Sequence, residues 1–214
     1  MVVEICTTGE EMETTDVVIC GGGPTGALLS AYLGQMSIPN VVLEKEKEIV
    51  TDPRGIALDE DGIRLLQGLG LYDQVYTEIG EPMGWVHFTS GKQGLTTKPF
   101  MKMNLSTTGP FGHVGAISHK QPVLERNIRE AASRFSSSEL RLGSTVMAIE
   151  EDETGVSVDY RGDDGRSRQI RGKFLVGADG KTGFTRKHYL EPKGIVLESL
   201  PGYGFMGVLD KTQY

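Results

Sequence analysis

A short apolar segment that runs directly into a glycine-rich turn constrains the fold of this chain more than any other feature. Residues 16–20 read Asp-Val-Val-Ile-Cys, and Gly21-Gly-Gly23-Pro-Thr-Gly26 follows, which matches the pattern G-x-G-x-x-G between a strand and a helix. Gly21 permits the tight turn, Gly23 lets the backbone approach a pyrophosphate, and Gly26 lets the helix and the strand pack closely. The N-terminus of the helix offers free N–H groups to an anion. This order of elements predicts a dinucleotide-binding site.

The second predicted strand supplies an acidic residue at the spacing that such a site requires. Val41-Val-Leu43 is followed by Glu44, at about the distance from the turn expected for the acid that binds the ribose hydroxyls. A carboxylate there disfavours a 2′-phosphate, so the motif favours FAD or NAD over NADP. The alternative is a glycine-rich turn with a surface glutamate, which would leave the order of strand, turn, helix, strand and acid unexplained.

Composition and charge exclude several classes of partner. The 214 residues are 38% hydrophobic and 24% charged, as in a globular protein with its own core. A formal charge of −7 argues against nucleic acid, because proteins that bind nucleic acid carry a basic face. No apolar run approaches the ~20 residues that span a bilayer, and residues 1–15 lack the regions of a secretory signal, so we expect a cytoplasmic location.

The cysteines and histidines predict neither a disulfide framework nor a metal site. Only Cys6 and Cys20 occur, and Cys20 ends the first predicted strand, where a small buried side chain fits. The four histidines have neither metal-ligand spacing nor an acid at a fixed offset: His87, His113, His119 and His188. We therefore expect no bound metal.

Hydrophobic periodicity and turn residues predict an α/β chain. Helices are expected at 24–35, 57–69, 122–135 and 185–190. Strands are expected at 16–20, 41–43, 85–89, 144–150, 156–160, 167–171 and 174–176. The three strands between 144 and 171 form an antiparallel β-meander, in which Asp163-Asp-Gly165 makes the second hairpin turn.

These elements predict a Rossmann-like domain whose mainly parallel sheet carries the antiparallel β-meander. We expect residues 16–192 to form this domain and residues 1–15 to be a flexible N-terminus. Residues 193–214 are expected as a tail or the start of a further domain, with a strand at 204–209. The apolar strand at 174–176 runs into a second glycine turn, Gly177-Ala-Asp-Gly180.

The order of these motifs resembles the N-terminal part of the group A flavoprotein monooxygenases, the para-hydroxybenzoate hydroxylase-like family. The resemblance covers residues 16–192 and rests on the first glycine turn, Glu44, Pro53-Arg54-Gly55, Gln121 before the helix with Leu124-Glu125, and Gly177-Ala-Asp-Gly180. It implies FAD as the cofactor, NAD(P)H as the reductant, and hydroxylation of a small aromatic or polyketide-like molecule. No catalytic acid or base is predicted, because in such enzymes the cofactor carries the chemistry.

The resemblance also assigns roles to single residues. It implies that Arg54 contacts the cofactor near its phosphates, that Asp179 organises contacts with FAD and NAD(P)H, and that Gln121 lies near the flavin. The residues themselves leave other roles open: Arg54 as a solvated loop cation, Asp179 as a turn or cap residue, and Gln121 as a cap of its own helix. The predicted cofactor-binding residues are Gly21, Gly23, Pro24, Thr25, Gly26, Glu44, Lys45, Arg54, Gln121, Asp179 and Gly180.

The chain departs from the family pattern after the second glycine turn. Lys181 follows this turn where the family often has a small residue. After this turn, the family continues through a sheet that covers the substrate and a Gly-Asp pair that binds the ribityl chain, and neither is found between Lys181 and Tyr214. Two alternatives to a monooxygenase therefore stay open: a truncated relative that binds a hydrophobic metabolite or catalyses a non-redox cyclisation, and an inactive fragment that needs a second chain.

Without those segments, a sheet edge and the apolar faces of the helices at 24–35 and 122–135 would be partly uncovered. Exposed apolar patches and open sheet edges tend to find a partner. We therefore expect self-association or a complementing chain, in addition to a small hydrophobic or aromatic substrate.

Overall fold

The computed structural model describes residues 12–51, 55, 57–89, 98–110 and 112–196. In chain order, the elements are β1 (Glu13–Cys20), α1 (Pro24–Gln35), β2 (Asn40–Leu43), β3 (Ala57–Asp59), α2 (Glu60–Gly68), α3 (Tyr72–Gln74), the π-helix η1 (Val75–Ile79), β4 (Gly80–Pro82), β5 (Trp85–Phe88), β6 (Met101–Asn104), β7 (Ala116–His119), α4 (Gln121–Ala132), β8 (Ser138–Arg141), β9 (Thr145–Asp152), β10 (Gly155–Arg161), β11 (Ser167–Gly177), the π-helix η2 (Thr185–Leu190) and the 3₁₀-helix η3 (Glu191–Lys193).

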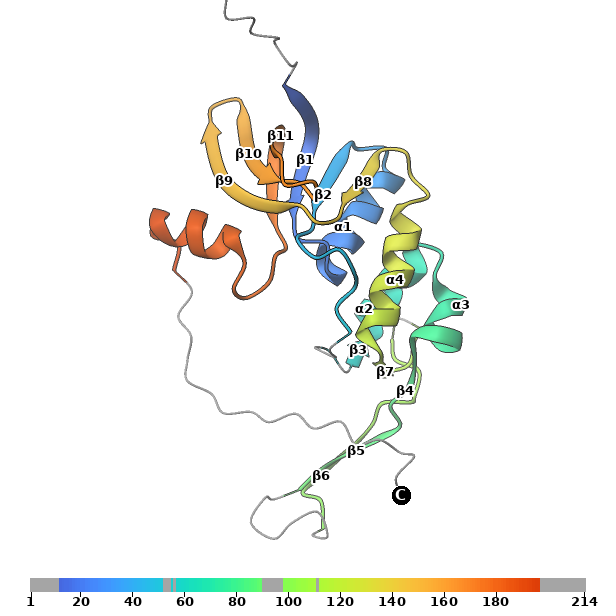
Figure 1. Ribbon diagram of the computed structural model, residues 1–214. Helices are drawn as coiled ribbons and strands as arrows, with labels where there is room; N and C mark the ends of the chain where they lie inside the picture. The colour runs from blue at the N-terminus through green and yellow to red at the C-terminus, as the bar shows by residue number, and fades with distance from the viewer. Residues whose placement is uncertain (1–11, 52–54, 56, 90–97, 111, 197–214) are drawn as a thin grey trace, which may run out of the picture.

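The main sheet has the strand order β8-β2-β1-β11-β10-β9 (Figure 1). β1 lies inside the sheet and pairs in parallel with β2 and β11, and β2 pairs in parallel with β8. β11, β10 and β9 pair with one another in antiparallel order. The structure thus confirms the predicted Rossmann-like sheet with its antiparallel β-meander.

The apolar run of β1 is buried on both faces of the sheet, as expected for a strand between covered neighbours. Val17 and Ile19 pack toward α1, whereas Val18 and Cys20 belong to the core on the opposite face. Val18 and Ile19 are fully buried, and burial of each side chain contributes roughly 1.5–3 kcal/mol. This burial fixes the end of β1, where the first glycine turn begins.

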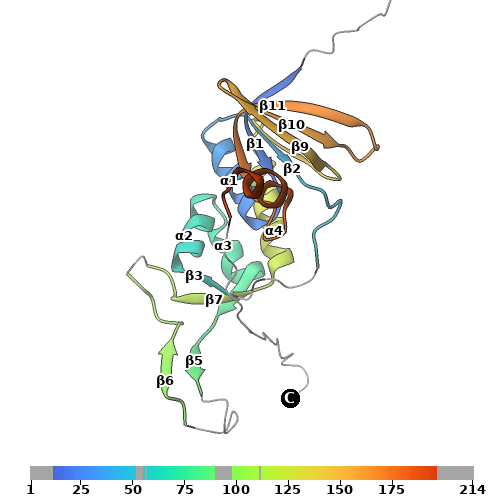
Figure 2. The same cartoon turned by 90° about the vertical axis from the view of Figure 1, so that its left-hand side faces the viewer.

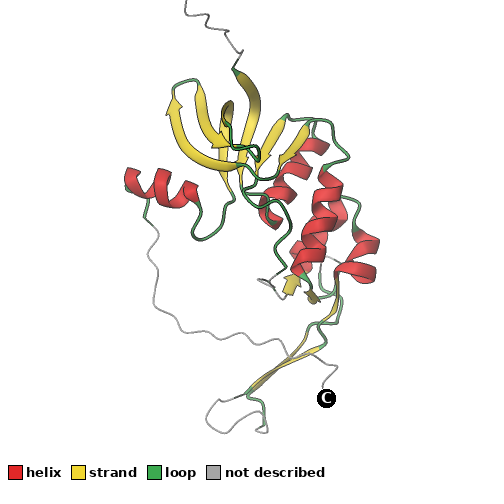
Figure 3. Cartoon of the chain, in the orientation of Figure 1, coloured by secondary structure: helices red, strands yellow, loops and turns green. Residues whose placement is uncertain are grey.

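The helices α1 and α4 pack against each other on one side of the main sheet, and η2 lies on the other side (Figures 2 and 3). Their contact buries Ala27 and Ala31 of α1 with Leu124 and Ile128 of α4, in a core that α2, η1 and β7 complete. The faces that the two helices turn toward each other are therefore covered, whereas Leu28 and Tyr32 of α1 are only partly buried, so the expected uncovered apolar surface is limited to such side chains. The small side chains of α1 allow α4 to approach closely.

A buried amide joins β2 to α1 and β8. Asn40 Nδ2 donates to the carbonyls of Ile38 and Ser137 at 3.0 and 3.3 Å. The same nitrogen donates to Ser138 Oγ at 3.0 Å, and Asn40 Oδ1 accepts from Ser30 Oγ at 2.6 Å. Because a buried polar group is stable only when its hydrogen bonds are made, this network specifies how the three elements meet.

The two strands predicted at 167–171 and 174–176 form one continuous strand, β11. It pairs antiparallel with β10 on one side and runs parallel beside β1 on the other. Gly172 and Lys173 interrupt the apolar pattern, which is why the sequence suggests a break. A Cβ on Gly172 would come within 2.9 Å of Val18 Cγ2, so the glycine lets β1 and β11 stay paired here.

Other short elements also differ from the prediction. The helix expected at 57–69 begins only at Glu60, because Asp59 caps α2 by accepting the N–H of Gly62 at 3.0 Å. The preceding residues form β3. The strands β4, β7 and β8 were not predicted, since runs of three or four residues give too little periodicity. By contrast, α1 and η2 have the predicted bounds.

A two-stranded ribbon of β5 and β6 extends away from the main sheet (Figures 1 and 2). It exposes large apolar side chains: Trp85 is 63% exposed, and Phe100, next to β6, is 75% exposed. No helix among the described residues has the length and apolar character needed to cross a membrane.

Parts of the predicted organisation lie outside the described residues. These parts are Cys6 with the first eleven residues, and the strand expected at 204–209. At the N-terminal boundary, β1 begins at Glu13 rather than at Asp16.

Candidate functional site

The first glycine turn lies where β1 ends and α1 begins, and the second glycine turn packs against it. Gly21 has a φ of +101°, and its N–H donates to the Leu43 carbonyl at 2.8 Å. A Cβ on Gly21 would come within 2.5 Å of the Ala178 carbonyl oxygen. A Cβ on Gly26 would overlap the Gly21 carbonyl oxygen. Both positions therefore need glycine for the fold itself.

Gly23 stands in open space. Its φ of −66° and ψ of −176° suit any residue, and a Cβ added there would meet no heavy atom within 4 Å. Gly23 is the N-cap of α1, Pro24 opens the helix, and no side chain caps it. The first turn of a helix carries N–H groups that have no partner within the helix. The space before Gly23 therefore fits an anion such as pyrophosphate.

Glu44 follows β2 directly and lies beside the first turn. Its side chain is buried, with the residue 8% exposed. Oε2 accepts the N–H of Gly22 at 2.6 Å, and Oε1 accepts the N–H of Glu46 at 2.8 Å. A carboxylate oxygen has two acceptor sites, so both oxygens retain capacity for a ribose hydroxyl. The neighbouring Lys45 is exposed, and its Nζ lies 3.6 Å from Glu46 Oε1.

An ion pair on α4 contacts the first turn from the side of the helices, and the sequence motifs do not predict this contact. Arg129 donates from Nε and Nη2 to the Gly22 carbonyl at 3.1 and 2.9 Å, and Nη2 lies 2.6 Å from Glu125 Oε1. The sequence does contain a pattern that could have indicated this ion pair. An acid and a base four residues apart directly follow Leu124 and Ile128, on the apolar face that was predicted to pack inward.

Asp179 anchors the second glycine turn. Its Oδ2 accepts the N–H of Thr185, the first residue of η2, at 2.8 Å. Gly183 lies against this carboxylate, where a Cβ would overlap it. The side chain thus has the capping role that the sequence left open. Asp179 also lies beside the first turn, since a Cβ on Gly21 would come within 2.6 Å of its Cα.

Gln121 lies farther along α4. It is the first residue of the helix, which has no side-chain cap, so the capping role considered for Gln121 is not found. It precedes Arg129 by eight residues, which separates the two by roughly 12 Å along the helix axis.

Arg54 lies outside the described residues, but its neighbour Gly55 is placed. A Cβ on Gly55 would lie 3.7 Å from Gln121 Oε1 and 3.3 Å from His119 Nε2. Burial lowers the pKa of His119 below its ordinary value. Gly55 therefore lies close to the start of α4.

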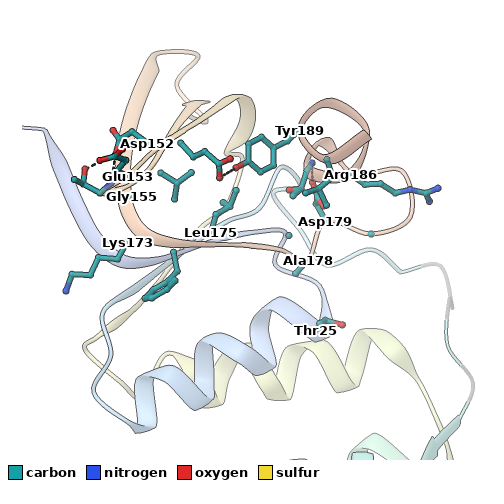
Figure 4. A pocket seen from close by; sticks show the side chains of 18 of the residues that line it. Thr25, Asp152, Glu153, Gly155, Lys173, Leu175, Ala178, Asp179, Arg186 and Tyr189 are labelled. Carbon is teal, nitrogen blue, oxygen red and sulfur yellow. Dashed lines mark hydrogen bonds between the residues drawn. The ribbon is translucent and has the colours of Figure 1, made fainter. Parts of the chain in front are cut away.

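An open cavity of about 1040 Å³ adjoins the two glycine turns (Figure 4). Thr25 borders it at the start of α1, and Asp179 and Gly180 border it at the second turn. Its larger part lies between the β-meander and η2, and its lining includes neither Gly23 nor Glu44. The first turn and Glu44, rather than this cavity, therefore define the candidate nucleotide position. Within the described ranges, no group of three or more His, Cys, Asp or Glu side chains is placed to hold a metal ion.

The structure thus brings one set of predicted residues together and leaves the others apart. The first turn, Glu44, Asp179 and Gly180 meet where β1, β2, β11 and α1 join. This arrangement fits the ADP half of a dinucleotide, because it combines an uncapped helix N-terminus, open space at Gly23 and a buried carboxylate.

Comparison with known proteins agrees with this geometry. Residues 14–200 match the family model of the FAD binding domain. The chain is 31% identical over 179 residues to the 3-(3-hydroxy-phenyl)propionate/3-hydroxycinnamic acid hydroxylase of Paraburkholderia xenovorans (strain LB400), a match that covers 83% of this chain and 28% of the hydroxylase. The chain therefore spans less than a third of this relative's length.

Two solved structures share the fold. The p-nitrophenol 4-monooxygenase PnpA from Pseudomonas putida DLL-E4 has a TM-score of 0.71 at 25% identity, over 82% of this chain and 44% of PnpA. The flavin-dependent monooxygenase PieE, solved in complex with FAD and substrate, has a TM-score of 0.67 at 24% identity, over 79% of this chain and 31% of PieE. The chain therefore belongs to the FAD binding domain family, among the group A flavin monooxygenases, and its cofactor is FAD.

Proposed function

We propose that this protein is an FAD-dependent monooxygenase that takes electrons from NAD(P)H and hydroxylates a small aromatic molecule. The observation that carries the proposal is the junction of β1, β2 and α1, where the open space before Gly23 lies close to the buried carboxylate of Glu44. The relatives favour a phenolic substrate, since their names specify a hydroxyphenyl acid and a nitrophenol.

In this proposal, free N–H groups at the start of α1, among them those of Thr25 and Gly26, hold the pyrophosphate. Gly21 and Pro24 shape the turn beside it, and the positive end of the helix dipole offsets part of the charge of the pyrophosphate. Glu44 accepts hydrogen bonds from the ribose hydroxyls, with Lys45 beside it. Asp179 and Gly180 border the same site from the second turn. Gln121 belongs to the part of the site nearer the start of α4. Arg54, which lies outside the described residues, is proposed to contact the cofactor near its phosphates.

When bound, the flavin supplies hydride acceptance and oxygen chemistry. The groups of the chain bind and orient it. Two of them are held by the fold in advance: the Glu44 carboxylate by two backbone N–H groups, and Asp179 by the start of η2. Such preorganisation reduces the ordering that binding requires.

The proposal is tested on the purified protein by titration with FAD, followed by visible absorbance and flavin fluorescence. NADH or NADPH is then added with 3-hydroxyphenylpropionate or p-nitrophenol. We expect saturable binding, consumption of the reduced nicotinamide that the phenol accelerates, and a hydroxylated product. A lack of saturable FAD binding would contradict the site, and binding without product would contradict the proposed reaction.

Two further expectations stay predictions from the sequence: a cytoplasmic location, and self-association or a complementing chain. The exposed side chains of Trp85 and Phe100 on the projecting ribbon support a partner surface there. Size-exclusion chromatography with light scattering measures the self-association.

A further inference from the structure

We propose that Arg129 is a positioning residue of the cofactor site, which sets the orientation of the Gly22 peptide in the first glycine turn. The inference rests on the proposed function only for the identity of the ligand. The guanidinium reaches from α4 to a single carbonyl with two hydrogen bonds, from Nε at 3.1 Å and from Nη2 at 2.9 Å.

Glu125, one helical turn earlier, holds the guanidinium in place. Its Oε1 lies 2.6 Å from Arg129 Nη2, and the side chains of Arg129 and Glu125 are only 11% and 6% exposed. A planar guanidinium that is bound at once to a carboxylate and a carbonyl has a fixed orientation, which a flexible ammonium on a lysine would not reproduce.

The contact matters because Gly22 and Gly23 share a peptide plane. In a trans peptide, the C=O of one residue and the N–H of the next point in opposite directions. Holding the Gly22 carbonyl toward α4 therefore directs the Gly23 N–H away from α4.

The preceding peptide is fixed as well, since the Gly22 N–H donates to Glu44 at 2.6 Å. Both peptides that flank Gly22 are thus oriented by ionisable side chains from two separate elements. The turn has its shape before any ligand binds, which lowers the cost of ordering it on binding.

Packing alone does not explain the ion pair. Replacement of a buried ion pair by apolar side chains of similar size is often neutral or stabilising, so a helix that only had to cover α1 would not need it. The same helix offers an internal contrast. Arg126 is 53% exposed and lies 3.9 Å from Glu78, and such surface pairs contribute little.

The experiment compares four proteins in the full chain: wild type, the double variant E125L/R129M, R129K and the control R126M. The double variant removes both charges, so neither is left buried without its partner. Isothermal titration measures the Kd for ADP and for FAD. Hydrogen exchange without ligand follows the peptide that contains residues 21–23, and urea unfolding reports stability.

We expect the double variant to remain folded, to bind ADP and FAD about tenfold more weakly, and to exchange faster at residues 21–23. R129K keeps the positive charge but lacks the planar guanidinium, so its affinity and exchange rate should lie between those of the double variant and wild type. R126M should match wild type in both. The proposal is overturned if the double variant keeps wild-type exchange and affinity, or if R126M shows the same losses. If wild type binds neither ADP nor FAD, the proposed function fails, and the exchange data still decide the role of Arg129.

Discussion

Glu44 Oε2 accepts the N–H of Gly22 at 2.6 Å, so the acid assigned to the ribose also holds the glycine turn. The bond joins the end of β2 to the turn that follows β1. The other oxygen is fixed by the N–H of Glu46 at 2.8 Å. One buried side chain thus couples ribose recognition to the shape of the pyrophosphate site.

Replacing Glu44 with alanine should remove both roles. We expect the affinity for ADP and FAD to fall by about 1–3 kcal/mol, because the ribose hydroxyls lose an acceptor and the Gly22 N–H loses its partner. Isothermal titration measures the loss. Glu46→Ala is the matched control, since it keeps the backbone N–H that reaches Glu44. Equal affinities for the two variants would contradict the assignment.

Alanine substitutions at two glycines of the turn should have different effects on the free energy of unfolding. Gly26→Ala places a methyl group on the Gly21 carbonyl, so we expect the free energy of unfolding to fall by roughly 1–3 kcal/mol. Gly23→Ala places it in open space at an ordinary φ. The lower entropy of the unfolded chain and the poorer N-cap preference of alanine oppose each other, so stability should stay within about 1 kcal/mol of wild type. Urea denaturation of both variants checks this, and similar losses in the two would show that the turn geometry is wrong.

The Asn40 network should contribute to stability without touching the ligand. Asn40→Ala removes the partner of the Ser30 and Ser138 hydroxyls, and we expect a loss of about 2–4 kcal/mol of unfolding free energy. The control is Asn104→Ala, because within the described part of the chain the Asn104 side chain bonds only its exposed neighbour Ser106. A loss in the control as large as that of Asn40→Ala would count against the network.

Alkaline pH should weaken the fold through Cys20. Burial raises the pKa of this thiol from 9.0 to about 12. The unfolded chain ionises the thiol at lower pH than the folded chain, so the contribution of the buried neutral thiol is complete below pH 9.0 and declines as the pH rises toward 12.

This effect is measured as the difference in unfolding free energy between wild type and Cys20→Ala at several pH values. We expect the difference to shift in favour of the variant above pH 9.0. A difference that stays constant with pH would show that Cys20 does not titrate in this way.

The sequence predicts the parts of the site whose residues lie at fixed distances from one another along the chain. The strand, the glycine turn, α1 and Glu44 follow from local rules, because each glycine has a local steric reason and Glu44 directly follows a short apolar strand. The sequence does not predict contacts that depend on how distant elements meet. Arg129 reaches Gly22 only because α4 packs on α1, and no local pattern specifies that approach.

Secondary structure was missed for a related reason. β8 is a short strand, Ser138–Arg141, whose alternation is too brief to recognise, and it exists because Asn40 and Ser138 join it to β2 and α1. β11 reads as two strands because Gly172 breaks its pattern, whereas pairing with β1 keeps it continuous. Tertiary pairing, rather than local preference, decides both.

The most direct test of the central claim is an equilibrium titration of FAD into wild type, Gly23→Ala and Gly115→Ala, followed by flavin fluorescence. Gly115 is the matched control, because a Cβ there makes only ordinary contacts, the nearest at 3.4 Å from Leu105. If the pyrophosphate lies before Gly23, Gly23→Ala should remain folded and bind FAD roughly tenfold or more weakly than wild type, while Gly115→Ala binds as wild type does. Unchanged FAD affinity in a folded Gly23→Ala protein would contradict the account.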